Sequence, residues 1–369
     1  MLKNIGIFTH DLYPYKPWGQ GRYVYDLSRH MRLRYPGKIL IFSPSPGIDD
    51  PHHVEVFSGS HASAGKNITF SLKLGLILED LIEKYDLGLI HCQGGAGGIF
   101  LTRKPPVPVV YTVHHTYYQQ ATYINSQSWK KLLFFWEKFS YRNSDFLICD
   151  SPSTQRALDS RYDLRTPTAV IFCGVDQAQF RGLDMSRTPN SIFFMGRLET
   201  RKGIDFLVKS LPLVKARCEN VRLYIAGSGI LRPQLERMVE GYGLDRNVSF
   251  LGVLPDDAVN EWYNKVSLVV VPSIFEGFGL NAAEAMACGT PVVATDVDGL
   301  RDVVEDGVSG RLVPFNDMNA LSESILSLLT DDAERQRLAE NGKHRAKTMF
   351  NWENISQQVL AVYQSVLNE

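Results

Sequence analysis

The chain has 369 residues, of which 44% are hydrophobic and 21% are charged, a composition ordinary for a globular protein at a length too great for one core. No apolar run approaches the roughly 20 residues that a membrane-spanning helix needs. Residues 1–183 carry 20 Lys and Arg against 15 Asp and Glu, and the remainder carries 19 against 25. The basic N-terminal half fits an anionic partner or an anionic membrane surface. Its excess of positive charge is too weak to predict a nucleic-acid partner.

The first half of the chain alternates short apolar runs with longer amphipathic stretches. The run at 5–8 is too short for a signal peptide and is expected to form the first strand. Strand and helix in alternation predict a parallel sheet covered by helices on both faces. The expected strands are 5–8, 39–42, 87–90, 107–113 and 146–149, and the expected helices are 23–34, 71–85 and 128–142.

The strand expected at 107–113 is followed by His114 and His115. Adjacent residues on an extended chain point to opposite faces, so the two histidines are expected to have different surroundings. A histidine at a strand end is either a capping or core residue or a contact to a bound molecule, and both interpretations are open here. We find no His, Cys or Asp spacing in the sequence that predicts a metal site.

The helix expected at 128–142 has an aromatic and basic sequence. Its apolar positions fall on one helical stripe, which predicts a face packed on the core. Lysines flank the stripe, so the same helix also fits a position on an anionic membrane surface. The sequence leaves both interpretations open. The stripe consists of Trp129, Leu132, Leu133, Trp136 and Phe139.

The second half repeats the alternation after a polar, proline-containing stretch at 182–190. We therefore expect an N-terminal domain at 1–183 and a C-terminal domain at 184–351. Each is expected to be a doubly wound α/β domain, with a ligand at the carboxyl ends of its strands. The expected strands are 191–195, 222–226, 248–251, 268–271, 291–294 and 310–313, and the expected helices are 203–218, 231–242, 255–265, 281–288 and 319–329.

Two strand ends in the second half carry loops suited to phosphate. Gly196 is followed by Arg197 and Lys202, whose guanidinium and ammonium suit a diphosphate, whereas Arg201 is expected to be solvated. The strand at 222–226 ends in Gly227-Ser228-Gly229. A dinucleotide-binding fingerprint would need a third glycine where Arg232 stands, so that reading fails.

The most specific segment begins after the strand at 268–271. Glu276 is followed by Gly277-Phe278-Gly279-Leu280, and Glu284 comes eight residues after Glu276, inside the helix expected at 281–288. The order is strand, glycine loop, helix. A helix N-terminus offers unpaired N–H groups, and the two carboxylates can accept hydrogen bonds from hydroxyl groups. The segment therefore predicts a site for a polyol phosphate. Asp296-Val297-Asp298, further on, is interpreted as a turn and not as a metal site.

These motifs together resemble the donor site of retaining glycosyltransferases of family 4, the group 1 glycosyl transferases, which include sucrose synthases and bacterial mannosyl- and glucosyltransferases. The resemblance extends over nearly the whole chain. It implies the GT-B architecture, in which two Rossmann-like domains face each other across a cleft, and a final helix at 352–369 that packs back on the first domain. Two positions depart from the family pattern, since Trp18 and Cys173 replace a usual glycine and a usual asparagine.

The resemblance implies a role for each site residue. Arg197 and Lys202 would stabilise the leaving diphosphate, Glu276 would bind the sugar hydroxyls, and His114 would contact the donor sugar near the reacting carbon. Glu284 would hold the ribose. The donor-binding set is expected to be Gly19, Gly21, Gly196, Gly227, Gly229, Val253, Leu254, Gly277, Phe278, Gly279, Leu280 and Glu284.

The sequence thus predicts transfer of a hexosyl group from a UDP- or GDP-sugar to a glycan or lipid-linked acceptor, with no metal or other cofactor. Five cysteines, without a Cys-x-x-Cys pair, fit a cytoplasmic protein with reduced thiols, with peripheral membrane contact through 128–142 as an open option. Two other functions are also open. One is a sugar-nucleotide epimerase on the same architecture, and the other is a non-catalytic sugar-nucleotide-binding subunit of a glycosylation complex.

Overall fold

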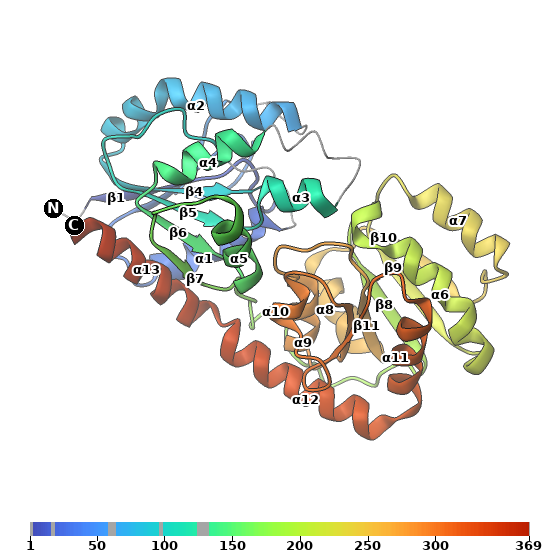
Figure 1. The fold of residues 1–369 in the computed structure, drawn as a ribbon. Helices are drawn as coiled ribbons and strands as arrows, with labels where there is room; N and C mark the ends of the chain where they lie inside the picture. Colours follow the sequence, from blue (N-terminus) through green and yellow to red (C-terminus); the bar gives the residue numbers. More distant parts are fainter. Residues whose placement is uncertain (1–2, 16–18, 58–63, 96–98, 124–132, 369) are drawn as a thin grey trace. The chain divides into compact units, whose positions relative to one another are not determined.

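The computed structural model describes residues 3–15, 19–57, 64–95, 99–123 and 133–368 (Figure 1). The chain divides into two compact units. Unit 1 consists of Met1–Gly174 and Trp352–Glu369, and unit 2 is Val175–Asn351. Within the described residues, no helix combines the length and the apolar character that crossing a membrane requires.

Unit 1 is built on a seven-stranded sheet in which every neighbouring pair is parallel. The central strands are buried along their whole length and are mostly apolar, as expected for a parallel sheet covered on both faces, with buried polar exceptions such as His91 and Gln93. Their order is β3-β2-β1-β4-β5-β6-β7. The strands are β1 (Asn4–Phe8), β2 (Ile39–Ser43), β3 (His53–Glu55), β4 (Leu87–Gly94), β5 (Val109–Val113), β6 (Phe146–Cys149) and β7 (Thr168–Val170).

The helices of unit 1 include one from the far end of the chain. The last helix, α13, lies against α1 and β4. His91 Nδ1 is 2.5 Å from the Tyr363 hydroxyl, and a Cβ on Gly174 would come within 2.3 Å of the Trp352 ring, so both ends of α13 are closely packed. The helices are α1 (Gln20–Arg32), α2 (Ala64–Lys84), α3 (Tyr117–Tyr123), α4 (Phe134–Arg142), α5 (Pro152–Arg161) and α13 (Trp352–Asn368).

Unit 2 repeats the architecture with a six-stranded parallel sheet of order β10-β9-β8-β11-β12-β13. Its strands are β8 (Ser191–Met195), β9 (Arg222–Ala226), β10 (Val248–Gly252), β11 (Leu268–Val271), β12 (Val292–Thr295) and β13 (Arg311–Val313). Its helices are the 3₁₀ turn η2 (Thr200–Lys202), α6 (Ile204–Arg217), α7 (Arg232–Gly241), α8 (Asp256–Lys265), α9 (Leu280–Ala287), α10 (Leu300–Val303), α11 (Met318–Thr330) and α12 (Asp332–Met349).

The predicted α/β class with two doubly wound domains is confirmed, and the predicted strands are present with small shifts of their ends. The short strands β3 and β7 and the helices α3, α5, α10 and α12 were not predicted. The division between the units falls at Gly174, nine residues before the predicted boundary at 183. Residues after Gly174 belong with unit 2 because the backbone N–H groups of Arg181 and Leu183 donate to the amide oxygens of Asn260 and Asn264.

The predicted core stripe of 128–142 is confirmed at Leu133, which is buried, and is wrong at Trp136 and Phe139. Residues 128–132 lie outside the described residues. Trp136 and Phe139 are 42% and 45% exposed, whereas Glu137 and Tyr141 are buried. The helix turns this polar face inward because Glu137 has partners there. Its carboxylate accepts hydrogen bonds from the Tyr117 N–H and from the Tyr141 hydroxyl, both at 3.0 Å, and from the Tyr162 hydroxyl.

Candidate active site

The site in unit 2 is organised by the close approach of two strand ends. Gly203 follows η2 with a φ of 63°, and a Cβ at this position would lie 1.8 Å from the carbonyl oxygen of Pro272, after β11. Only glycine fits such a contact in this conformation. The Ile274 N–H also donates to the Arg201 carbonyl oxygen at 2.9 Å. These contacts bring the basic turn η2 against the loop that carries Glu276.

Glu276 sits between two cations. Lys202 Nζ donates to Glu276 Oε1 at 2.6 Å, and Arg201 Nη1 donates to Glu276 Oε2 at 3.0 Å. The Ser273 hydroxyl adds a third donor to Oε1 at 2.8 Å. All of these groups are largely buried, and the side chain of Glu276 is only 9% exposed. The strand end therefore presents a carboxylate held in place on both oxygens.

The charge of Glu276 follows from these contacts. Burial alone would raise the pKa of its carboxyl, but Lys202 and Arg201 outweigh burial and lower the pKa to about 2. Glu276 is therefore ionised throughout the neutral range. An ionised carboxylate only accepts hydrogen bonds, so the groups it can bind in a ligand are hydroxyls and other donors.

The expectation that Arg201 is solvated is wrong. Its side chain is 16% exposed and bonds the Phe275 carbonyl oxygen and Glu276, whereas the Arg197 side chain is 58% exposed and pairs with Glu199 at 3.1 Å. Because Arg197 and Arg201 are close in the sequence, the sequence could not show which of them is buried. The fold of η2 decides which one turns inward. Arg201 and Ser273 are thus site residues that sequence reasoning missed.

The glycines after β8 and β9 allow the neighbouring loops to touch. Gly227 has a φ of 125°, and a Cβ there would lie 1.9 Å from the carbonyl oxygen of Gly196. Gly229 packs in the same way against the backbone of Leu198, and the Leu198 N–H donates to the Ser228 carbonyl oxygen at 2.8 Å. Because no side chain stands between these loops, they pack backbone against backbone at this sheet edge.

The loop after β10 lies at the same edge. The Gly227 N–H donates to the Gly252 carbonyl oxygen at 2.6 Å, which ties this loop to the one after β9. Val253 follows directly and is 57% exposed, and Leu254 comes before α8. An exposed backbone segment in this position offers N–H and C=O groups rather than side chains to a bound molecule.

Glu284 lies one turn into α9. The helix begins at Leu280 with Gly279 as its N-cap, so the first N–H groups of α9 point toward the glycine loop. The Tyr263 hydroxyl donates to Glu284 Oε2 at 3.0 Å. Phe278 is buried with its ring edge against Phe350, at a centroid distance of 5.2 Å, which anchors the loop. Asp296, further on, pairs with Arg301 at 2.7 Å, in keeping with its interpretation as a turn.

In unit 1, the predicted glycines lie at the start of α1. Gly19 is the N-cap of this helix, with a φ of 59°, and Gly21 lies in its first turn. Trp18, which departs from the family pattern, lies outside the described residues. The Gly19 backbone conformation is one that a residue with a side chain rarely adopts.

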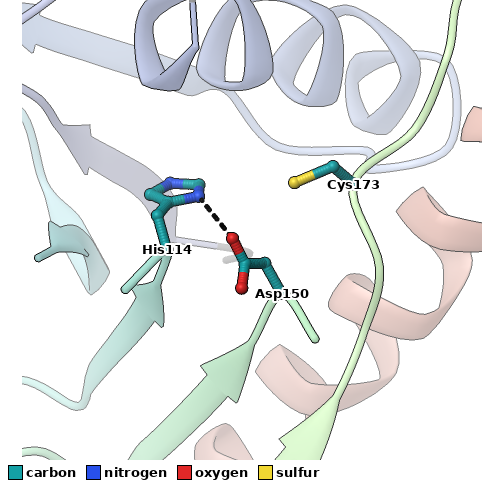
Figure 2. A group of neighbouring side chains, drawn as sticks. All are labelled: His114, Asp150 and Cys173. Atoms are coloured by element: carbon teal, nitrogen blue, oxygen red, sulfur yellow. Dashed lines mark ion pairs between the residues drawn. The ribbon is translucent and has the colours of Figure 1, made fainter. Parts of the chain in front are cut away.

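His114 follows β5 and is buried. Its Nε2 is 2.9 Å from Gln93 Oε1, and its Nδ1 is 3.5 Å from Asp150 Oδ2 (Figure 2). The Tyr23 ring packs edge-on against the imidazole with a centroid distance of 4.8 Å. Sequence reasoning did not find Gln93 and Asp150 as partners, although both follow or end neighbouring strands. Gln93 and Asp150 lie beside His114 because of the register between neighbouring strands, which their spacing in the sequence does not reveal.

The structure therefore joins Lys202, Glu276 and the newly found Arg201 in one contact network of unit 2. Arg197 lies just before η2, is exposed, and contacts Glu199, which also pairs with Arg201. Glu284 belongs to the helix that follows the Glu276 loop. His114 belongs to a separate network of unit 1 with Gln93 and Asp150.

Both units match described protein families. Residues 175–345 match the family described as glycosyl transferases group 1, and residues 18–179 match the one described as Glycosyltransferase Family 4. An uncharacterized glycosyltransferase of Methanocaldococcus jannaschii is 31% identical over 318 residues, covering 85% of this chain and 86% of that protein. A D-inositol 3-phosphate glycosyltransferase of Xylanimonas cellulosilytica is 40% identical over 47% of this chain and 41% of its own length.

Solved structures also have a similar fold. Sucrose-phosphate synthase from Thermosynechococcus elongatus superposes with a TM-score of 0.87 at 25% identity over 100% of both chains. HepE of Anabaena, solved with UDP and glucose, has a TM-score of 0.75 at 21% identity over 99% of this chain and 100% of its own. With its two parallel-sheet units, the chain has the GT-B fold, and it belongs to the glycosyl transferases of group 1 as an enzyme that transfers glycosyl groups.

Proposed function

We propose that the enzyme transfers a hexosyl group from a UDP- or GDP-sugar to a hydroxyl of a glycan or lipid-linked acceptor, with retention of the anomeric configuration. The observation that carries this proposal is the ionised Glu276 between Lys202 and Arg201, on the glycine loop before α9. Support also comes from HepE, which was solved with UDP and glucose.

Glu276 is proposed to accept hydrogen bonds from the hydroxyls of the donor sugar. Its two oxygens are fixed by three donors, so it is oriented before the sugar arrives. The backbone N–H groups of Gly277 to Gly279 would add donors on the same loop. Because the carboxyl has a pKa of about 2, it keeps its charge throughout the neutral range.

Lys202 and Arg197 are proposed to bind the diphosphate. An ammonium has three N–H donors, so Lys202 can bond Glu276 and a phosphate oxygen together. The Arg197 side chain is exposed and pairs with Glu199, so it can turn toward a phosphate without breaking a buried contact. Stabilising the leaving nucleoside diphosphate by fixed cations is electrostatic catalysis, and we propose that it proceeds without a metal. Chelator-treated enzyme is then expected to keep its transfer rate.

The remaining donor contacts are assigned to helix α9 and two loops. Glu284 is proposed to hold the ribose hydroxyls, with its other side bonded by Tyr263. Val253 and Leu254 would meet the nucleobase through their backbone. The glycines at 196, 227 and 229 would let the nucleotide approach the sheet edge closely.

Unit 1 is proposed to supply the acceptor site and one donor contact. His114 would hydrogen-bond the sugar near the reacting carbon, with Gly19 and Gly21 at the start of α1 approaching the phosphate or the acceptor. The acceptor proton would pass to a leaving phosphate oxygen, which needs no protein base. Reduced thiols favour a cytoplasmic setting, and membrane contact through 128–142 stays a prediction, since residues 128–132 lie outside the described residues.

Calorimetric titration tests the donor site. UDP, GDP, ADP and their glucose, N-acetylglucosamine, galactose and mannose conjugates are titrated into the enzyme, and acceptor-dependent release of the nucleoside diphosphate is then measured. Selective binding of one nucleotide sugar is expected. Acceptor-independent conversion of the sugar would favour the epimerase, and binding without any turnover would favour the non-catalytic subunit. The anomeric configuration of the product, read by NMR, tests retention.

Glu276→Ala tests the role of the carboxylate. We expect transfer to fall by at least about 100-fold, the cost of losing one preorganised polar contact to the reacting group. Nucleoside diphosphate affinity should stay the same or increase, because a negative charge leaves the neighbourhood of two cations. Glu240→Ala, at an exposed position of α7, is the matched control and should change neither. A comparable loss of nucleotide affinity in Glu276→Ala would overturn this assignment.

A further inference from the structure

Three potential metal ligands end three consecutive strands of the unit 1 sheet. His114 follows β5, Asp150 follows β6 and Cys173 comes shortly after β7, and these strands are neighbours in the sheet. Figure 2 shows the three side chains turned toward one another, from separate segments of the chain. One ligand atom from each lies within 4.8 Å of the others, and all three residues are buried. Parallel strand ends meeting at one sheet edge explain the grouping.

His114 and Asp150 each have one polar side-chain atom bonded to a neighbouring residue and a second polar atom that faces the other ligands. Gln93 Oε1 lies 2.9 Å from His114 Nε2, and a carbonyl oxygen can only accept, so this contact holds the imidazole through Nε2–H and leaves Nδ1 facing Asp150 Oδ2. The Thr154 hydroxyl donates to Asp150 Oδ1 at 2.9 Å, and Oδ2 faces His114. Outer hydrogen bonds of this kind orient metal ligands in general.

The spacing suits a tetrahedral ion. Bonds of 2.0–2.3 Å to zinc put neighbouring ligand atoms about 3.3–3.7 Å apart. His114 Nδ1 and Asp150 Oδ2 are already 3.5 Å apart, and the Cys173 Sγ lies within 4.8 Å of both. Nitrogen, sulfur and carboxylate oxygen are together the ligand set of Zn²⁺ rather than of Mg²⁺ or Ca²⁺.

We propose that His114, Asp150 and Cys173 form a Zn²⁺ site in unit 1, with Gln93 fixing the imidazole. Binding forms Zn–N, Zn–O and Zn–S bonds, and a water fills the fourth position. It releases to solvent the thiol proton of Cys173 and the proton by which His114 Nδ1 bonds Asp150. Zinc there occupies His114, so it inhibits sugar transfer rather than supporting it. This last consequence rests on the proposed role of His114 in donor binding, whereas the metal site itself does not.

Cobalt substitution tests the site directly. The purified full-length chain is stripped with a chelator, dialysed and titrated with Co²⁺, followed by competition with Zn²⁺. We expect one equivalent of Co²⁺ with the visible bands of a tetrahedral ion and a thiolate-to-metal charge-transfer band, and displacement by one equivalent of Zn²⁺. The spectrum does not depend on turnover, so failure of the metal site and failure of the proposed transferase function are distinguishable.

Variants assign the ligands. Cys173→Ser should remove the charge-transfer band, whereas Cys218→Ser, a half-buried cysteine of unit 2, should keep it. Gln93→Ala should weaken Zn²⁺ binding by about 10–100-fold while keeping the band, the usual effect of removing an outer partner of a ligand. Circular dichroism and thermal unfolding establish that each variant folds. Absence of a thiolate band in the folded wild-type chain, or its persistence in Cys173→Ser, would overturn the proposal.

Discussion

The two units each bury a glutamate, and the two carboxyl groups behave in opposite ways. Glu276 of unit 2 lies between Lys202 and Arg201, and its pKa is lowered to about 2. Glu137 of unit 1 is more deeply buried, and there burial prevails over the hydrogen bonds from Tyr162, Tyr117 and Tyr141 and raises the pKa to about 7.

This comparison separates the effect of burial on the pKa of a carboxyl group from the effect of its charged or neutral partners. Burial favours the neutral acid at both sites, and neutral donors such as phenols offset it only in part, whereas two full charges reverse it. Glu276 is thereby a permanent anion suited to a ligand contact. Glu137 is a structural hydrogen-bond acceptor that sits inside a helix and has no charged partner among the interactions that hold it.

The largest expected effect comes from removing one cation at Glu276. Lys202→Met leaves a buried carboxylate with Arg201 as its remaining cation, and breaking a buried ion pair from one side costs about 3–5 kcal/mol in the free energy of unfolding. Urea unfolding of the wild type and variant measures the loss.

A double variant is the control for this prediction. Lys202→Met combined with Glu276→Gln removes both charges, so much of the lost stability should return. If the double variant is no more stable than Lys202→Met alone, the stability of this site does not depend on the charge pair, and the contrast with Glu137 disappears.

A pH series tests Glu137. Its pKa in the folded protein, about 7, lies above the ordinary 4.5, so the folded state binds the proton more tightly than the unfolded state. Stability is therefore greatest below pH 4.5 with respect to this group and falls as the pH rises through 7, by about 3 kcal/mol in all. Glu276 has its full stabilising effect above pH 4.5 and loses it only as the pH falls toward 2, so it does not contribute in the same window.

Glu137→Gln provides the comparison, because the amide does not titrate. The difference in unfolding free energy between wild type and Glu137→Gln should change by about 3 kcal/mol between pH 4.5 and pH 8. Parallel pH profiles for the two proteins would show that Glu137 keeps an ordinary pKa and that the phenols suffice to hold its charge.

The smallest expected effect distinguishes charge from geometry at Glu276. Arg201→Lys keeps the cation but loses the guanidinium fork, whose Nη1 donates to the Phe275 carbonyl oxygen and Glu276 and whose Nε donates to Glu199. We expect a loss of about 1 kcal/mol, the net value of one hydrogen bond, in urea unfolding. The exposed Arg197→Lys is the matched control and should be neutral for stability. A loss as large as that of Lys202→Met would mean that the fork, and not the charge, holds Glu276.

Much of the fold follows from local patterns. Strands such as β5 and β11 are rich in β-branched residues, and the strand-helix alternation is sufficient to indicate two doubly wound sheets. The unpredicted α5 and α12 carried start signals that could have been used: Ser151 and Asp331 cap these helices, and Pro152 occupies the first turn of α5. The three-residue edge strands β3 and β7 are too short for any periodicity to reveal.

The parts of the site that consist of residues close together in the sequence could be predicted. The Glu276 loop and the basic turn are local segments, and their strand-end positions follow from the alternation. Their contact does not, because it depends on Gly203 approaching Pro272 across two strands. For the same reason, the sequence could not identify Arg201 as the buried arginine or group His114 with Asp150 and Cys173.

Helix α13 has a consequence for how the protein is made. Unit 1 is completed only by Trp352–Glu369, after all of Val175–Asn351 has left the ribosome. At about 5–20 residues per second, that intervening segment takes about 10–35 s to synthesise. Throughout this interval the surface that receives α13 is uncovered, and His91 lacks its bond to Tyr363. Unit 1 therefore reaches its final packing only at the end of synthesis, whereas the whole of unit 2 has been synthesised before α13 is made.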